Sequence, residues 1–203
     1  MKLQKDAFYL GIDLNDKYAM ISYFQLNMEE PETVSMVAGS EMYQVPLVLA
    51  KRKGVGQWYY GDDANKMAKT SEMICVDNLL KRAVSGESIR IDDKLYDAVD
   101  LLALYLRKLI TLPQMLGNSH EVSRVAITVD RLTRENMEMF WKIAGKLGLK
   151  PEQFLVIDHK ESFYYFALNQ QEDLWLHDVF LFEYDNQSMH YYALMRNVRT
   201  TPQ

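Results

Sequence analysis

The first candidate for chemistry is an aspartate at the end of a hydrophobic segment. Gly11-Ile12-Asp13-Leu14 closes that segment, and Asn15-Asp16-Lys17 follows as a tight turn. A carboxylate at such a strand end can hold a metal-bound water, or it can accept hydrogen bonds from the N–H groups of the turn. On these residues alone, the structural interpretation is favoured.

Other reactive residue types do not gather into a recognisable site. The four histidines lack the spacing of metal ligands, and no Ser-His-Asp order or nucleophile elbow occurs. These histidines are His120, His159, His177 and His190. The single cysteine, Cys75, excludes an internal disulfide. The run Lys51-Arg52-Lys53 predicts a solvated hairpin tip. We therefore expect no metal site.

The elements that must position these residues follow from periodicity and turn residues. A meander of three strands is predicted at 7–14, 18–26 and 33–38. Further strands are predicted at 45–50, 57–61 and 88–91, with Asp62 capping a helix over 63–70. A long helix is expected to start at Asp92 and Asp93 and to end near Pro113 or Gly117. Its apolar face comprises Leu95, Val99, Leu102, Leu106 and Leu109.

The last third of the chain is the most strongly patterned. A strand at 124–129 precedes a helix that Thr133 caps and Gly148 ends. A strand at 154–157 precedes an aromatic helix at 160–169, which we expect to be buried. The segments 179–184 and 189–195 predict a hairpin around a turn at 185–188. Strand, helix, strand, helix and hairpin together predict an α/β fold with a mixed sheet.

The composition is typical of an ordinary globular protein. The 203 residues carry a formal net charge of -5, with 48% hydrophobic and 25% charged residues. An acidic balance argues against binding a nucleic-acid backbone, which needs clustered Lys and Arg. No apolar run approaches the roughly 18 residues that a membrane span needs, and no signal peptide fits the start. We therefore expect a cytoplasmic protein.

The order of these elements resembles the first half of the actin, sugar-kinase and heat-shock-chaperone ATPase superfamily, and is most similar to the seventy-kilodalton chaperone. Four segments carry this resemblance. They are Gly11-Ile12-Asp13-Leu14, then Asp77 with Lys81-Arg82-Ala83-Val84-Ser85-Gly86, then Ala126-Ile127-Thr128-Val129 with Ala144-Gly145-Lys146-Leu147-Gly148-Leu149, and finally Ile157-Asp158-His159-Lys160-Glu161-Ser162. The resemblance implies an RNase-H-like mixed sheet with flanking helices, which binds Mg-ATP through two phosphate hairpins.

The resemblance also implies which positions would carry chemistry. Asp13, Lys81 and His159 stand at catalytic positions, with His159 replacing the family's glutamate. The positions that match the phosphate hairpins are Asn15, Asp16, Lys17, Glu183 and Ser188. The family has Gly-Thr-Thr at positions 15–17 and glycines in the second hairpin, because the backbone must approach the phosphates closely, and it has an aspartate at the position of Glu183. This chain has bulkier and acidic residues instead, so the resemblance implies degenerate phosphate sites.

We expect an ATPase-like core at 1–39 and 93–178 and an inserted subdomain at 40–92. The hairpin at 179–203 resembles the start of a second lobe, so either the chain is a fragment or that lobe is absent. The expected function is a non-catalytic pseudo-ATPase that acts as a protein-interaction or scaffold module without a cofactor. The alternative is an active Mg-ATP-binding ATPase. Expected partners are a protein or a second copy, and neither nucleic acid nor a membrane.

Overall fold

The computed structural model describes residues 7–115, 121–170, 177–184 and 189–195. The chain divides into two compact units, residues 1–156 and 157–203. Each unit is described by itself. The predicted domain boundaries differ from this division and remain predictions. Within the described residues, no helix is long and apolar enough to cross a membrane.

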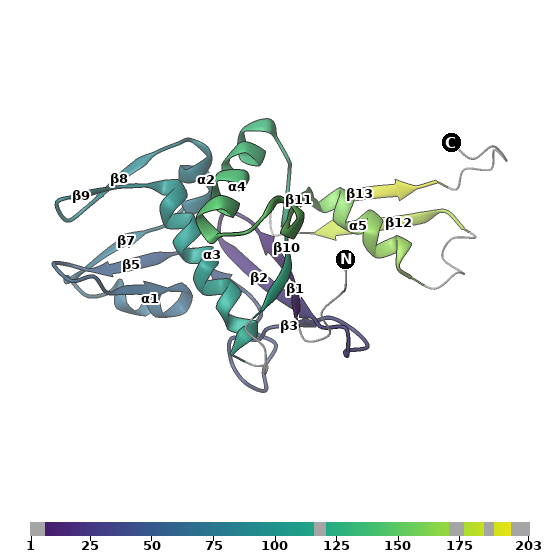
Figure 1. Ribbon diagram of the computed structural model, residues 1–203, viewed down its shortest axis with the longest axis horizontal. Coiled ribbons are helices and arrows are strands. Elements are labelled where there is room, and N and C mark those ends of the chain that lie inside the picture. Colours follow the sequence, from purple (N-terminus) through teal and green to yellow (C-terminus); the bar gives the residue numbers. More distant parts are fainter. Residues whose placement is uncertain (1–6, 116–120, 171–176, 185–188, 196–203) are drawn as a thin grey trace. The chain divides into compact units, whose positions relative to one another are not determined.

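The main sheet is mixed and is centred on strand β1. Its order is β11-β10-β1-β2-β3, and β4 also pairs with β2. β1 runs antiparallel to β2 and parallel to β10 (Figure 1). The strands are β1 (Phe8–Leu14), β2 (Tyr18–Phe24), β3 (Glu32–Thr33), β4 (Val45–Pro46), β10 (Val122–Val129) and β11 (Phe154–Asp158). This arrangement confirms the α/β class with a mixed sheet and flanking helices.

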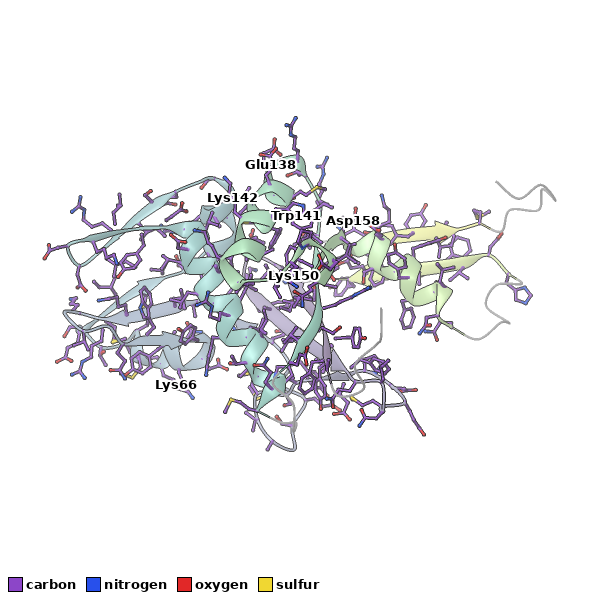
Figure 2. The ribbon with its side chains drawn as sticks, in the orientation of Figure 1. Lys66, Glu138, Trp141, Lys142, Lys150 and Asp158 are labelled. Atoms are coloured by element: carbon purple, nitrogen blue, oxygen red, sulfur yellow. The ribbon has the colours of Figure 1, made fainter. Side chains whose placement is uncertain are left out.

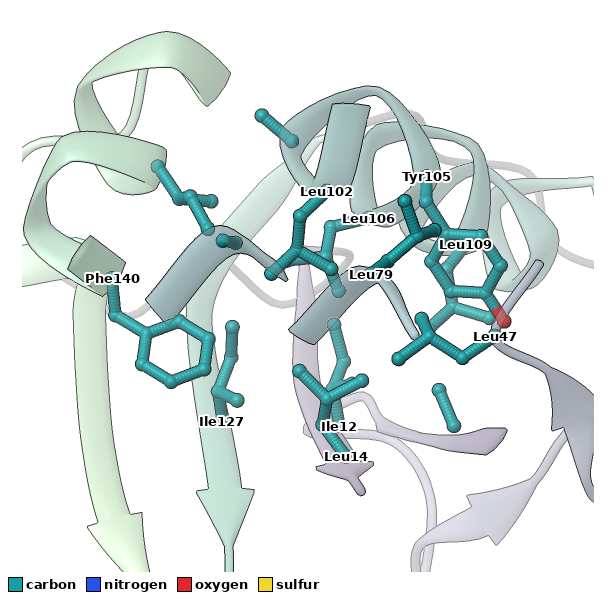
Figure 3. Close-up of a cluster of buried hydrophobic side chains, with 14 of the residues drawn as sticks. Ile12, Leu14, Leu47, Leu79, Leu102, Tyr105, Leu106, Leu109, Ile127 and Phe140 are labelled. Atoms are coloured by element: carbon teal, nitrogen blue, oxygen red, sulfur yellow. The ribbon is translucent and has the colours of Figure 1, made fainter. Parts of the chain in front are cut away.

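The core lies on one face of this sheet. Alternate residues of β1 are buried, namely Phe8, Leu10, Ile12 and Leu14. They pack under α3 (Ala98–Gln114) and α4 (Arg134–Leu147), which contribute Leu102, Leu106 and Phe140 to the same cluster (Figure 3). Because side chains alternate along a strand, Asp13 projects from the opposite face of the sheet.

The caps predicted for the helix at 133–147, Thr133 at its start and Gly148 at its end, are confirmed. The Thr133 hydroxyl accepts the N–H of Asn136, and the Asn136 side chain accepts the N–H of Thr133, which together form a capping box. Gly148 ends the helix in the left-handed region, with φ of 75°.

The helix start predicted at Asp92 and Asp93 is wrong. These residues form the turn between β8 (Ser88–Ile91) and β9 (Lys94–Asp97), where Asp92 has a positive φ of 53°. The long helix α3 starts instead at Ala98, and the Asp97 side chain caps it by accepting the N–H of Val99. Leu95, which was placed on the apolar face of the helix, is an exposed residue of β9.

The region between β4 and α3 forms a small second sheet. Its strands are ordered β6-β5-β7, and a satellite cluster around Ala50 and Ala64 fills its core. Its elements are β5 (Leu49–Arg52), β6 (Trp58–Tyr60), α1 (Gly61–Met67), β7 (Met73–Val76) and α2 (Leu79–Val84). Asp62 lies inside the first turn of α1 and does not cap it, because the N-cap position belongs to Tyr60. β7 and α2 were not predicted.

Two other predicted segments also differ from the structure. The strand expected at 33–38 is only two residues long, because Ser35 and Ser40 hydroxyls both bond the carbonyl of Val37 and bend the chain.

The basic run was expected to be a solvated tip, but Lys51 lies in β5 and is only 7% exposed. Its ammonium donates to a carboxylate oxygen of Asp92 at 2.5 Å. This ion pair joins the small sheet to the β8–β9 hairpin.

The second unit consists of a helix and a hairpin. These are α5 (His159–Leu168), β12 (Val179–Tyr184) and β13 (Met189–Leu194). The rings of Phe163 and Tyr192 lie 5.8 Å apart and join the helix to one face of the hairpin. The expected burial of the aromatic helix is wrong, because Tyr164, Tyr165 and Phe166 are exposed.

A buried hydroxyl predicts a measurable loss of stability. The Tyr105 side chain is fully buried and donates to the carbonyl of Val45 at 3.0 Å, and its burial raises the pKa of the hydroxyl well above the usual range. Tyr105→Phe leaves that carbonyl without this donor, so the free energy of unfolding should fall by about 1–2 kcal/mol. Denaturant unfolding measures the change. Tyr164→Phe, at an exposed tyrosine, should change it by less than about 0.5 kcal/mol. Equal effects of the two variants would contradict the prediction.

The ion pair of Lys51 and Asp92 predicts a pH dependence. The hydrogen bond from Lys51 holds the pKa of the Asp92 carboxyl below its usual value of 3.8. A lowered folded-state pKa contributes stability that is present above the unfolded pKa and is lost as the pH falls through the folded one. Asp92→Asn should therefore destabilise the protein at pH 7, and the difference from wild type should shrink below about pH 4. Unfolding at a series of pH values measures it.

A matched control removes an exposed ion pair from the same sheet. Arg52 and Glu72 lie 3.1 Å apart with both side chains mostly in solvent. Glu72→Gln should therefore change stability little at any pH. An Asp92→Asn variant that keeps the wild-type pH dependence would show that the pair of Lys51 and Asp92 contributes nothing.

Candidate functional site

The turn that follows β1 is capped by its own asparagine. The Asn15 Oδ1 atom accepts the backbone N–H groups of Lys17 at 2.8 Å and Tyr18 at 2.9 Å. The Asn15 N–H donates to the Tyr18 carbonyl at 3.1 Å. Asp16 and Lys17 are exposed at the tip. The backbone amides of Asn15, Lys17 and Tyr18 are therefore already hydrogen-bonded within the chain.

The predicted catalytic residues Asp13 and Lys81 do not share one face of the sheet. Asp13 stands opposite Met20 of β2 and Thr128 of β10, on the face that α3 does not cover. Lys81 is exposed on α2, whose Leu79 belongs to the core cluster on the other face. Lys81 forms part of a short helix that packs against α3 and α4.

The predicted residues His159 and Glu183 are brought together in the second unit. The His159 Nδ1 atom contacts the Glu183 Oε1 atom, and the Tyr192 hydroxyl donates to Glu183 Oε2 at 3.3 Å. The side chains of His159 and Glu183 are 13% and 19% exposed. Both carboxylate oxygens therefore have a partner within the unit. The arrangement joins the start of α5 to the hairpin.

Sequence reasoning missed Tyr192 as a member of this cluster. The alternation of the strands was the sequence signal that could have found it. Tyr192 pairs with Leu181, and Leu181 shares a hairpin face with Glu183 two residues further on. At the start of α5, Asp158 caps the helix by accepting the N–H of Glu161 at 2.8 Å. Ser188, the remaining predicted phosphate position, lies outside the described residues.

A groove in the first unit was also missed, because α2 was not predicted. It has a volume of about 570 Å³ and lies between α2, the start of α3, and α4. Glu138 and Lys142 of α4 line it, and Figure 2 labels both on that helix. Lys146, also at the groove, pairs with Asp100 at 2.5 Å. Charges of both signs thus line the groove, which gives it no preference for an anion or a cation.

The hairpin carries an uncharged face that we call the aromatic face. It is defined by Phe180, Phe182, Tyr184, Met189 and Tyr191. The register Phe182 to Tyr191 and Tyr184 to Met189 places these side chains on one side of the two strands. Their exposed fractions range from 55% for Phe180 to 79% for Tyr184. The rings of Phe182 and Tyr191 stack with centroids 6.2 Å apart.

The alternation of the segment Val179-Phe-Leu-Phe-Glu-Tyr184 was the sequence signal for this face. Monomeric proteins seldom expose contiguous apolar patches of this kind, and those that occur often mark binding surfaces. The aromatic face is therefore a candidate surface for another protein, and its chemistry differs from that of the polar turn after β1.

No curated protein matched the chain. Residues 30–203 matched the family described as "Family of unknown function (DUF5716) C-terminal". Because this match covers well over half of the chain, the protein belongs to that family.

Proposed function

We propose that this protein is a non-catalytic domain of the actin-like and heat-shock-chaperone-like ATPase kind, with an RNase-H-like fold, that acts in the cytoplasm as a protein-interaction or scaffold module. The single observation that carries the proposal is the turn after β1. There the Asn15 side chain holds the backbone amides of Lys17 and Tyr18.

Phosphate binding by a turn needs backbone N–H groups that point at the ligand. In this turn an anion would have to displace the Asn15 oxygen from two amides, and the exchange gains little because two existing hydrogen bonds are lost. Asp16, exposed at the tip, adds a negative charge that repels a phosphate. Lys17 offsets that charge only in part.

The sheet topology supports the proposed fold. A meander of β1, β2 and β3, followed later in the chain by β10 of the same sheet, has the order of elements that the resemblance implies. A helix, α4, then leads from β10 to β11, the next strand of the same sheet.

The state of Glu183 agrees with a domain that binds no Mg-ATP. At the position where the family has an aspartate, both oxygens of Glu183 have a partner, His159 or Tyr192. A cation would have to compete with both contacts for this carboxylate. We propose no cofactor, and Mg-ATP belongs to the alternative of an active ATPase.

The aromatic face supports a protein partner over a nucleic acid. It contains no basic residue, and the chain as a whole carries a net charge of -5. Nucleic-acid surfaces are strongly positive because they must neutralise phosphates. The groove between α2 and α4 is less informative, because its charges are mixed.

Titration calorimetry of the chain with Mg-ATP tests the proposal. We expect no binding heat and no thermal shift at millimolar ATP, because the turn offers no amide cradle. A Kd tighter than roughly 100 μM, equivalent to about 5.5 kcal/mol, would favour the active ATPase. In that case Asp13→Ala should weaken the affinity for Mg-ATP, whereas an alanine substitution on an unrelated surface should leave that affinity unchanged.

The structural role of Asn15 has its own test. Asn15→Ala removes the acceptor of two amides, so the free energy of unfolding should fall by about 1 kcal/mol. Asp16→Ala, at the neighbouring exposed position, should change it by less than about 0.5 kcal/mol. Denaturant unfolding of both variants measures the contrast, and an Asn15→Ala protein as stable as wild type would remove the argument from the turn.

A further inference from the structure

We propose that the aromatic face of the β12–β13 hairpin is a self-association surface, whose partner is the same face of a second copy of this chain. The inference rests on the proposed function and deepens it, because it names the partner of the interaction module. Four observations on the second unit support it.

The two faces of the hairpin are in different environments. One face contacts α5 through Phe163 and Tyr192 and through His159 and Glu183. The aromatic face lies on the other side of the same two strands, and each of its five members is more than half exposed. An isolated two-stranded hairpin is marginally stable in water, so burial of the second face would add to its stability.

The area of the aromatic face is close to what a dimer needs. A large aromatic side chain buries about 150–250 Å² when it is fully covered. At exposed fractions between 55% and 79%, the five side chains offer roughly 500–830 Å². A standard interface takes about 800 Å² from each partner, so two such faces form an interface at the lower end of that class.

The chemistry of the aromatic face favours a second copy over a charged partner. The face holds three kinds of side chain, which are phenyl, phenol and thioether, and it has no formal charge. Such a surface repels no copy of itself and requires no opposite charge. Interfaces between identical subunits are also the more apolar class. Nucleic-acid stacking surfaces combine aromatic rings with basic residues, which this face lacks.

The geometry suggests where the symmetry axis passes. In a dimer with two-fold symmetry, a patch pairs with its own copy. The stacked pair of Phe182 and Tyr191 occupies the middle of the face, with Phe180 on one side and Tyr184 and Met189 on the other. A two-fold axis through this pair would bring the Phe182 side chains of the two copies close together.

The test is sedimentation velocity of the full chain from about 1 to about 200 μM, a range in which interfaces of this size commonly dissociate. We expect concentration-dependent dimers of the wild-type protein. Phe182→Glu should weaken the dimer at least about tenfold, because two like charges would face each other in an apolar interface. The matched control is Leu95→Glu, since Leu95 is a 59% exposed strand residue of the first unit and Phe182 is 67% exposed. It should leave dimerisation unchanged.

A charge-swap experiment separates a broken interface from a broken fold. Phe182→Glu and Phe182→Lys should each weaken the dimer when alone, and an equal mixture of the two should recover dimers. Circular dichroism checks the fold of each variant. If either is unfolded, Phe182→Thr replaces it, because threonine keeps a strand preference while removing the ring. A folded Phe182→Thr protein should also show a weaker dimer.

A wild-type chain that stays monomeric throughout the concentration range would overturn the inference, as would a folded Phe182 variant that dimerises as well as wild type. Loss of dimerisation in Leu95→Glu alone would also overturn it, by moving the interface to the first unit. These results are independent of the nucleotide titration. ATP binding with dimerisation intact would defeat only the proposed function, and absent ATP binding with a monomer would defeat only the inference.

Discussion

The central constraint of the first unit is the alternation of β1 between two faces of the sheet. Phe8, Leu10, Ile12 and Leu14 must all be covered, and α3 and α4 cover them. β1 bonds β2 on one side and β10 on the other, so a slip of one residue would turn four buried side chains to the wrong face. The same alternation puts Asp13 on the face away from the helices. The position of the candidate catalytic carboxylate is thus a consequence of how the core is packed.

The small sheet is fixed to this core by a few polar contacts as well as by apolar packing. The Tyr105 hydroxyl reaches from α3 to the carbonyl of Val45, at the entrance to the small sheet. Lys51 and Asp92 join β5 to the β8–β9 hairpin, and Asp97 then caps α3 directly after β9. These contacts give hydrogen-bond partners to polar groups that are buried or that lie at turns and helix ends, where the backbone itself supplies none. The small sheet and the β8–β9 hairpin are therefore held in place in part by polar contacts at turns and at the ends of helices and strands.

The sequence predicts long, strongly periodic elements well and short, tertiary-dependent ones poorly. β1, β2, β10, α4 and the β12–β13 hairpin were predicted close to their observed bounds, because apolar alternation and the signals at Thr133 and Gly148 are local. α2 and β7 have six and four residues, too few for a period to show. Asp92 and Asp93 resembled a helix start, and only the pairing of β8 with β9 shows that they form a turn.

The candidate site was predictable in part, for the same reason. The resemblance placed His159 and Glu183 in one site, and the structure brings them together in the second unit. It did not indicate that Asn15 would cap its own turn, although asparagine at the start of a turn is known to bond the amides two residues on. The burial of Lys51 could not be foreseen, because its partner Asp92 lies 41 residues away in the chain.

Which polar groups are already hydrogen-bonded, and which apolar groups are still exposed, bears on the function of the chain. A site for a charged ligand needs polar groups that are not yet hydrogen-bonded, and a protein interface needs apolar area that is not yet covered. In this chain Asn15 holds the amides of its turn, and Glu183 holds two partners, whereas the aromatic face is exposed. The aromatic face is thus apolar area that no described residue of its own unit covers. Burial of apolar surface drives association at roughly 25 cal/mol per Å², less the entropy lost on binding. Covering the aromatic face would therefore contribute favourably to association, whereas an anion at the turn after β1 would first have to displace Asn15 from two amides.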